Sequence, residues 1–373
     1  MPARTLVVSD LHLGASSGAD VLRRPELRAP LIARLRDGID RLVILGDALE
    51  LREVPVHVAA AVAEPFLREA GEALGPGGEI VLAGGNHDHN LVAGWIETQL
   101  MQREPHTMGL EHRIEPAEAG PIPVSLAEAA APAALRFAYP GLWLRDDVYA
   151  LHGHYLDLHT TVPTIERLAA GAMARIVAPI PERATADDYE AVLAPMYAWM
   201  FALAQRSRDG VVRASSRSSA RAWVALAGEG RRARPARAAA LGAGLFGAVK
   251  ALNLAGVGPV RAELSGAALR RGSLAGMGEV LRRLGVDAPY VLFGHTHRSG
   301  PWPSDDPAEW RAPTGSRLIN TGNWIYQRHF LSDRDGEGPY WPGMAVLVEA
   351  SGPPRLERLL ADRTHAQLRP APA

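Results

Sequence analysis

Three stretches decide the fold: Thr5-Leu-Val-Val-Ser-Asp-Leu-His12, Arg41-Leu-Val-Ile-Leu-Gly-Asp47 and Glu79-Ile-Val-Leu-Ala-Gly-Gly-Asn-His-Asp88. Each is a short, mainly aliphatic run that ends in polar residues, with glycine among them in the second and third, a pattern typical of a buried strand. Helical spacing of apolar residues lies between them, over 30–37 and 56–74. Alternating strands and helices predict an α/β fold, whose site lies beyond the carboxyl ends of the strands.

Two later runs repeat the pattern, Val148-Tyr-Ala-Leu-His-Gly-His154 and Tyr290-Val-Leu-Phe-Gly-His-Thr-His297. The apolar runs 135–139 and 142–144 flank Pro140-Gly141, a dipeptide typical of turns, so we expect a hairpin that leads into the strand before His152. Strand patterns over 318–319, 344–349 and 355–359 follow without helices between them. We therefore expect a second, more antiparallel sheet, giving a two-sheet β-sandwich flanked by helices.

Residues 156–265 lack strand patterns and show helical spacing over 164–178 and 187–205. An arginine-rich stretch runs from Arg206 to Arg237. A helix predicted over 273–284 then leads back to the strand before His295. We expect a core formed by 1–155 and 266–373, interrupted by a helical insertion or cap at 156–265.

Composition limits the possible functions. The 373 residues carry 40 basic and 41 acidic side chains, so bulk charge gives no reason to expect nucleic-acid binding. The chain has no cysteine, which excludes disulfides, zinc–thiolate sites and thiol nucleophiles. We expect neither a signal peptide nor a membrane span, including at the weakly polar stretch 241–260, and hence a cytoplasmic protein.

The residues that follow the predicted strands carry oxygen and nitrogen donors. They are Asp10, His12, Asp47, Asn86, His87, Asp88, His152, His154, His295 and His297. Such donors suit Mn, Fe, Zn, Co or Ni. Residues two apart on extended chain point the same way, so Asp10 and His12 can reach one ion. The set exceeds what one ion needs, which favours two divalent metal ions that share a bridging carboxylate.

The order and spacing of these motifs resemble the calcineurin-like metallophosphoesterase family over residues 5–154 and about 285–325. The resemblance implies the αββα metallophosphoesterase fold. It also implies a first metal on Asp10, His12, Asp47 and His297, and a second on Asp47, Asn86, His152 and His295, with Asp47 as the bridge. His87 would be a non-ligand histidine that acts as general acid, oriented by Glu50, with Asp88 as the alternative orienting residue.

The implied activity is hydrolysis of a phosphoester or pyrophosphate bond by a hydroxide bound to two metals. Its substrate would be a phosphorylated small molecule or nucleotide. The motif Ser9-Asp-Leu-His-Leu13 and the helical insertion also resemble UDP-2,3-diacylglucosamine pyrophosphohydrolases, which leaves a lipid-linked substrate open. That branch carries arginine where His87 stands and aspartate where His154 stands. A nuclease of the same family, a non-catalytic metal-binding scaffold, and contact of the insertion with a membrane surface remain alternatives.

Other polar residues near the motifs have weaker assignments. His154, His89, Asn90 and Arg52 could line the site or serve the structure. The segment Asn320-Thr-Gly-Asn323 could border the site or form a turn. The remaining histidines match no motif and are assigned structural roles: His57, His106, His112, His159, His329 and His365.

Overall fold

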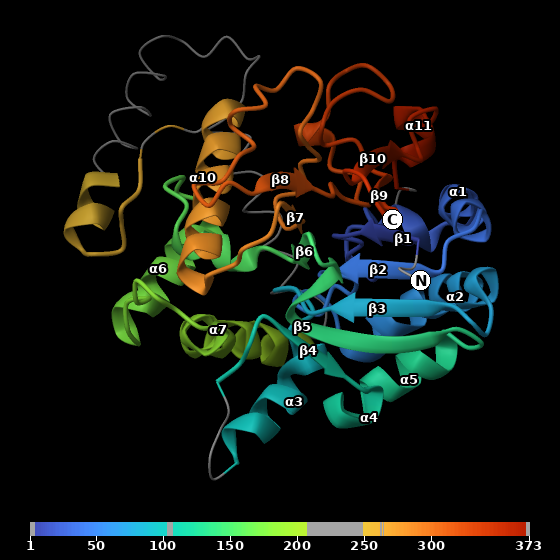
Figure 1. Cartoon of the computed structure of the whole chain (residues 1–373), viewed down its shortest axis with the longest axis horizontal. Helices are drawn as coiled ribbons and strands as arrows, with labels where there is room; N and C mark the ends of the chain where they lie inside the picture. The colour runs from blue at the N-terminus through green and yellow to red at the C-terminus, as the bar shows by residue number, and fades with distance from the viewer. Residues whose placement is uncertain (1–3, 103–106, 207–248, 262, 264, 371–373) are drawn as a thin grey trace.

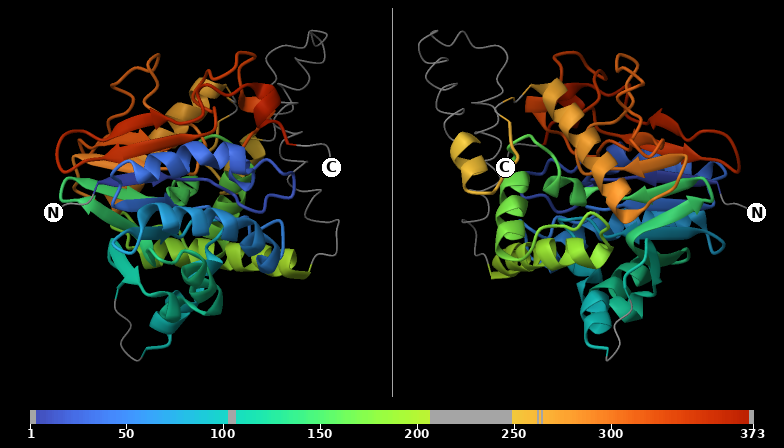
Figure 2. Two further views of the ribbon diagram at one scale, coloured as in Figure 1. Left: turned by 90° about the vertical axis from the view of Figure 1, so that its right-hand side faces the viewer. Right: turned by 60° about the vertical axis from the view of Figure 1, so that its left-hand side comes forward.

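The computed structural model describes residues 4–102, 107–206, 249–261, 263 and 265–370. Within them the chain has a mixed α/β fold, built on one large, curled, mixed sheet flanked by helices (Figures 1 and 2). The described sheet has ten strands in the order β10-β9-β1-β2-β3-β5-β6-β7-β8, with β4 paired to β5. The predicted α/β class is thus confirmed.

The first half of the sheet follows the sequence prediction. β1 (Thr5–Val8), β2 (Arg41–Leu45) and β3 (Glu79–Ala83) are neighbouring parallel strands. They are connected through α1 (Pro25–Arg36) and α2 (Val56–Leu74), which contact each other along one side of the sheet. Their carboxyl ends therefore lie at one edge and bring the three N-terminal motifs together.

The expected hairpin at Pro140-Gly141 is wrong. Residues Ala134–Arg145 form one continuous strand, β5, whose first half pairs in parallel with β3 and whose second half pairs antiparallel with β6 (Val148–Leu151). Glycine is required at 141 for close approach, because a Cβ there would lie 2.5 Å from the carbonyl oxygen of Ala150.

This long strand explains how the two halves of the sheet share one site. The last residue of β3, Ala83, pairs with Ala138, and the last residue of β6, Leu151, pairs with Gly141. The carboxyl ends of two oppositely directed strands therefore meet near the middle of β5. Asn86, which follows β3, and His152, which follows β6, are neighbours for this reason.

The remaining strands extend the same sheet. β7 (Tyr290–Phe293) and β8 (Arg317–Asn320) continue in parallel from β6. β9 (Met344–Val348) pairs antiparallel with β1, and β10 (Arg355–Arg358) pairs with β9. The C-terminal strands are antiparallel as expected, but they are hydrogen-bonded to the first sheet, so the structure does not confirm two separate sheets.

Buried side chains form two clusters, one on each face of the sheet. The fully buried members of the smaller cluster all come from strands, for example Val43, Val81, Ala150 and Val346. The larger cluster combines the opposite strand faces, such as Leu42 and Ile44, with the flanking helices. The alternation follows from the period of two in a strand. Both faces of the curled sheet are thus buried, which fixes the ends that carry the motifs.

Helices cover the site side of the sheet. α6 (Ile165–Ile176) and α7 (Ala186–Arg206) form at the two predicted helical segments of the insertion, beside α10 (Gly266–Leu284) (Figures 1 and 2). The other elements are η1 (Val21–Arg23), α3 (Asn90–Leu100), β4 (Glu111–Ile114), α4 (Pro116–Ala119), α5 (Pro121–Ala129), η2 (His154–Leu158), η3 (Arg328–Phe330) and α11 (His365–Leu368). Of the arginine-rich stretch, residues 207–237 lie outside the described residues.

Membrane-spanning helices were looked for across the part of the chain that the structure describes. None of the helices there combines the length and the apolar character that crossing a bilayer needs. Residues 241–248 of the stretch 241–260, singled out above for its weak polarity, lie outside those residues.

Candidate metal centre

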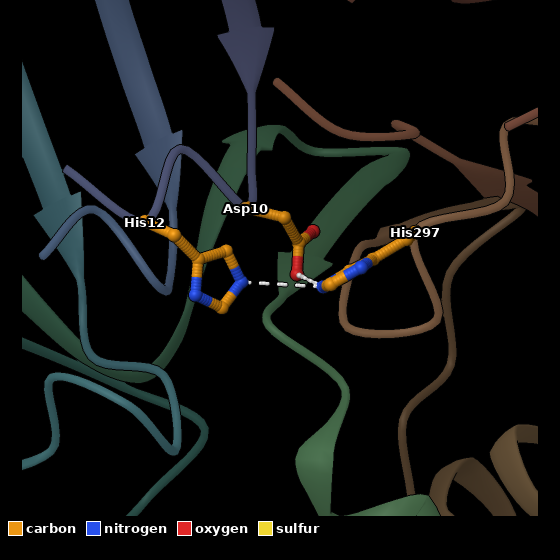
Figure 3. A group of neighbouring side chains, drawn as sticks. All are labelled: Asp10, His12 and His297. Atoms are coloured by element: carbon orange, nitrogen blue, oxygen red, sulfur yellow. Dashed lines mark hydrogen bonds and ion pairs between the residues drawn. The ribbon is translucent and has the colours of Figure 1, made fainter. Parts of the chain in front are cut away.

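The loops after β1 and β7 bring together Asp10, His12 and His297, whose side chains converge on one point (Figure 3). Nε2 of His12 lies 3.2 Å from Nε2 of His297, and the latter lies 3.3 Å from Oδ1 of Asp10. Asp10 is fully buried, and its Oδ1 has no hydrogen-bond partner among the described residues. A buried carboxylate oxygen that faces imidazole nitrogens is suited to a shared cation.

A second group forms around Asp47, His152 and His295. Oδ2 of Asp47 lies 3.3 Å from Nε2 of His152 and 3.7 Å from Nε2 of His12. Asp47 therefore lies between the two groups, in the position that a bridging carboxylate needs.

Asn86 completes the second group. Its amide oxygen lies 3.1 Å from Nε2 of His152, 3.1 Å from Nδ1 of His295 and 3.3 Å from Oδ2 of Asp47. In the reverse orientation the amide nitrogen would donate to these three atoms, and the oxygen would accept from Nη1 of Arg52 at 2.7 Å. A cation favours the first orientation, because it takes electron pairs from every one of these ligand atoms.

The spacing within both groups fits metal coordination. Bonds of about 2.1 Å place neighbouring ligand atoms of one ion about 3.0 Å apart in octahedral geometry and about 3.4 Å apart in tetrahedral geometry. The separations of 3.1 to 3.3 Å lie in this range. The donors are carboxylate, amide and imidazole groups without sulfur, which suits borderline divalent ions. The residues present thus fit the two-metal hypothesis.

The four histidines of these groups are held through the ring nitrogen that points away from the centre. The contacts are His12 Nδ1 to Glu50 Oε2 at 2.9 Å, His152 Nδ1 to the Leu45 carbonyl at 2.9 Å, His295 Nε2 to Asp157 Oδ2 at 3.0 Å, and His297 Nδ1 to Gln327 Oε1 at 3.4 Å. Every partner is an oxygen acceptor, so in the neutral ring the outer nitrogen carries the proton, which leaves the lone pair of the inner nitrogen for a cation. Metal-ligating histidines are oriented in this way.

The backbone at these residues is strained. In the described residues, left-handed φ angles outside glycine occur at Asp10 (54°), His12 (45°), Asp47 (52°), His295 (66°) and His297 (58°). All five are predicted metal ligands. Such conformations cost of the order of 1–3 kcal/mol each and persist where the surrounding structure imposes them, often at functional sites. The strain marks the same centre independently of the side-chain geometry.

Glycines before the ligands allow the loops to approach closely. At Gly294 a Cβ would lie 2.6 Å from Oδ2 of Asp10. At Gly85 it would lie 2.5 Å from the backbone nitrogen of Asp47. Both contacts are shorter than atoms tolerate, so the glycines of these motifs serve the packing of the ligand loops.

Buried carboxylates give the centre a strong preference for positive charge. Burial alone would lower the pKa of His152, but Asp47 and Asp10 outweigh it and raise the pKa to about 10. For His12, Glu50 and Asp47 likewise overcome the effect of burial and raise the pKa to about 9. A pocket that stabilises protons so strongly also stabilises a cation.

Glu50 contacts both His12 and His87. Nδ1 of His87 lies 2.7 Å from Oε2 of Glu50, and the His87 ring meets the His12 ring edge-on at 4.5 Å. Burial lowers the pKa of His87, and the nearby Glu50 only partly offsets that effect. Asp88 instead accepts from backbone nitrogens, including Gly85 at 2.7 Å and Ala48 at 2.6 Å, and thus ties two ligand loops together.

Several supporting residues were missed by the sequence analysis. Asp157, in η2, and Gln327 hold His295 and His297, but neither follows a strand or belongs to a motif. The segment 320–323 supports the same loop, because Asn320 donates to the Gly294 carbonyl at 2.9 Å and Asn323 donates to the His297 carbonyl at 2.6 Å. From sequence alone, this segment could either form a turn or border the site.

The residues with weaker assignments lie outside the two ligand groups. His154 is buried 5.5 Å from the His152 ring, outside the two ligand groups, and its Nδ1 has no partner among the described residues. His89 forms a buried pair with Glu190 of α7, at 2.7 Å. Asn90 begins α3.

The unassigned histidines are distributed outside the ligand groups. His57 is exposed, His112 accepts from the Gly109 backbone, His159 bonds to Tyr189, His329 contacts the Phe330 ring at a tilt, His365 bonds to Tyr326, and His106 lies outside the described residues.

A cavity of about 430 Å³ opens beside the centre, between α6 and α7. Its floor includes Arg52, Asn86 and Asp157. Its walls are mainly apolar, with Ala169 and Met173 from α6 and Met196 and Met200 from α7 among them. The insertion helices thus form a largely apolar chamber that reaches one of the predicted metal ligands.

Comparison of the chain with protein-family models and with curated proteins finds no match.

Proposed function

We propose that this protein is a metal-dependent phosphoesterase with two divalent ions, which hydrolyses a phosphoester or pyrophosphate bond. One observation carries the proposal: Asp10, Asp47, Asn86 and the four histidines converge with their coordinating atoms inward and, for the histidines, their outer ring nitrogens anchored. The resemblance of the motifs to calcineurin-like metallophosphoesterases supports the same assignment. Asp10, His12, Asp47 and His297 would hold one ion, and Asp47, Asn86, His152 and His295 the other.

When bound, two such ions supply an activated water and positive charge for the phosphoryl oxygens. The chain itself contributes alignment and a proton. Glu50 fixes Nδ1 of His87 and so leaves Nε2 of that ring to give a proton to the departing oxygen. An anionic phosphoryl group beside His87 raises the pKa that burial lowers, so the substrate favours the protonated, donating form.

The surroundings of the centre support one substrate class. The mainly apolar cavity between α6 and α7 fits a phosphorylated small molecule or nucleotide with an apolar part, and a lipid-linked substrate belongs to this class. The nuclease alternative depends on the arginine-rich stretch, of which 207–237 lie outside the described residues. The scaffold alternative predicts metal binding without turnover, which an assay separates.

The test is turnover of p-nitrophenyl phosphate and bis-p-nitrophenyl phosphate after chelation and reloading with manganese. We expect turnover in the wild type and a loss of at least a hundredfold in Asp47→Asn, because the bridging charge is removed. The control is His57→Gln, an exposed histidine outside the centre, which keeps full activity. A metal-loaded wild type that is inactive on mono-, di- and pyrophosphate esters would contradict the proposal.

A further inference from the structure

Glu190, on α7, lies at the centre of a buried polar cluster that joins the insertion to the core. Its Oε1 accepts from the hydroxyls of Tyr155, at 2.8 Å, and of Tyr139, and its Oε2 lies 2.7 Å from Nε2 of His89. All four side chains are buried. Burial alone would raise the pKa of Glu190, but His89 and the two tyrosine hydroxyls outweigh that effect and lower it. Glu190 is therefore a carboxylate engaged by three core residues, and it fixes α7 against the core.

One of these three partners belongs to the short helix that also supports the metal centre. The 3₁₀ helix η2 carries Tyr155 and, two residues later, Asp157, whose Oδ2 lies 3.0 Å from Nε2 of His295. Because a 3₁₀ helix has three residues per turn, residues two apart point to different sides. Helix η2 therefore reaches Glu190 of α7 through one side chain and His295 through the other.

The backbone of η2 is packed closely against α10. A Cβ at Gly276 would lie 3.1 Å from the carbonyl oxygen of Leu156 and 3.2 Å from the backbone nitrogen of Thr160. Glycine at this position lets the two backbones approach each other. The Thr160 nitrogen also donates to the Leu156 carbonyl at 2.8 Å, which closes the end of η2. Since η2 is a short, internally bonded element between α10 and α7, a displacement at Tyr155 also moves Asp157.

The anchor of His295 differs in origin from the anchors of the other ligand histidines. Those three anchors come from the core segments 1–155 and 266–373: Glu50, the Leu45 carbonyl and Gln327. Asp157 lies instead within the insertion, 156–265. His295 is therefore the ligand whose orientation depends on how the insertion docks on the core.

We infer that Glu190 is a positioning residue for the second metal ion, which it supports through Tyr155, η2 and the contact of Asp157 with His295. The inference rests on the two-metal centre of the proposed function. Asp157 keeps the inner nitrogen of His295 aimed at the ion, and loss of such a partner typically weakens metal binding by about 10–100-fold. Tyr155 acts one step further out, so its hydrogen bond contributes a smaller share.

The test measures manganese binding rather than turnover. The metal-free full chain is titrated with manganese(II), and electron paramagnetic resonance reports the free ion. The chains compared are the wild type, Tyr155→Phe, Glu190→Ala, Asp157→Ala and the double variant Tyr155→Phe/Asp157→Ala. Tyr149→Phe is the matched control, because Tyr149 is also fully buried and its hydroxyl donates to the Leu110 carbonyl at 2.7 Å, outside η2 and α7.

We expect Tyr155→Phe to weaken the binding of one ion by about fivefold, the worth of one hydrogen bond, and to leave the other within about twofold. Asp157→Ala should weaken the same ion by about 10–100-fold. In the Asp157→Ala chain, Tyr155→Phe should add less than about twofold, because its effect passes through Asp157. Glu190→Ala should weaken that ion at least as much as Tyr155→Phe does, and Tyr149→Phe should match the wild type.

A contact that serves only the stability of the fold gives different results. The inference is overturned if Tyr155→Phe weakens both ions equally, or if its full effect persists in the Asp157→Ala chain. It is also overturned if Tyr155→Phe leaves both affinities unchanged, or if Tyr149→Phe causes the same loss. If Glu190→Ala does not fold, Tyr155→Phe still decides, because it removes a single hydroxyl from the same cluster.

The positioning role and the proposed activity fail separately. If the variants behave as expected but the protein hydrolyses no phosphoester, the positioning role stands and the proposed activity is contradicted. If the wild type binds two manganese ions and turns over p-nitrophenyl phosphate, while Tyr155→Phe and Glu190→Ala bind manganese as the wild type does, the activity stands and the positioning role is contradicted.

Discussion

Replacing His297 by glycine and, separately, by alanine measures the backbone strain at one predicted ligand. His297 has a φ of 58°, and its side chain is 19% exposed. An alanine there keeps the left-handed penalty of about 1–2 kcal/mol, whereas glycine does not. At a position without such strain, glycine gives a free energy of unfolding about 0.5–1 kcal/mol lower than alanine, because glycine has greater freedom in the unfolded chain. We expect the glycine variant to be the more stable of the two, by about 0.5–1 kcal/mol.

The matched control is the same pair of substitutions at His87. Its side chain is 22% exposed and belongs to the same centre, but its backbone is not left-handed. There we expect alanine to be more stable than glycine by about 0.5–1 kcal/mol. The greater freedom of glycine in the unfolded chain contributes equally at both sites. Subtracting the glycine–alanine stability difference at His87 from that at His297 therefore leaves the backbone strain at His297, about 1–2 kcal/mol. Denaturant unfolding in the presence of a chelator gives all four free energies. An alanine preference of equal size at both sites would refute the strain argument.

Three further predictions concern other contacts. Glu50→Gln removes the carboxylate that anchors His12 and should weaken manganese binding by about 10–100-fold, measured by calorimetry; unchanged affinity would remove Glu50 from the centre. Glu190→Ala leaves His89 buried without its partner and should lower the free energy of unfolding by about 3–5 kcal/mol, whereas a loss below about 1 kcal/mol would contradict a buried pair. Burial lowers the pKa of His159 to about 4, below the value of about 6.5 in the unfolded chain. As the pH drops, the unfolded chain therefore takes up a proton at His159 before the folded chain does. The free energy of unfolding should fall between about pH 6.5 and pH 4. Thermal unfolding of His159→Gln should lose this part of the pH dependence, and an identical profile would contradict it.

Short aliphatic runs made the central strands predictable. β1, β2, β3, β6 and β7 occur where these runs lie, because a buried strand requires a dense run of apolar residues, and polar residues or glycine follow each run. The polar residues at their ends were predictable for the same reason. Their convergence follows from the strand positions, and it needed no knowledge of the loops.

The course of β5 could not be predicted from local sequence. Pro140-Gly141 is a turn signal at the level of the dipeptide, but the fold uses the glycine to admit the Ala150 carbonyl from the neighbouring strand. Only the tertiary pairing of β5 with both β3 and β6 decides between these uses. The same pairing connects β6, β7 and β8 to the first sheet, whereas β9 and β10 join that sheet through β1.

The periodicity of apolar residues also could not predict the contacts that residues in the insertion make. Tyr197 occupies a helical position that predicts core packing, and only the structure shows that its buried hydroxyl has no partner among the described residues. Glu190 gives no sign in sequence that it pairs with His89, which lies 101 positions away. Asp157 similarly acquires a role only because η2 places it against His295. Contacts between distant elements, rather than local pattern, define these residues.

Metal stoichiometry tests the central claim most directly. The full chain, stripped with chelator, reloaded with manganese and passed through a desalting column, is analysed by mass spectrometry of the metal, alongside Asp47→Asn. The two groups of ligands joined by Asp47 predict two ions per chain in the wild type and fewer than two in the variant. A wild type that retains no metal, or a variant that retains as much as the wild type, would contradict the account.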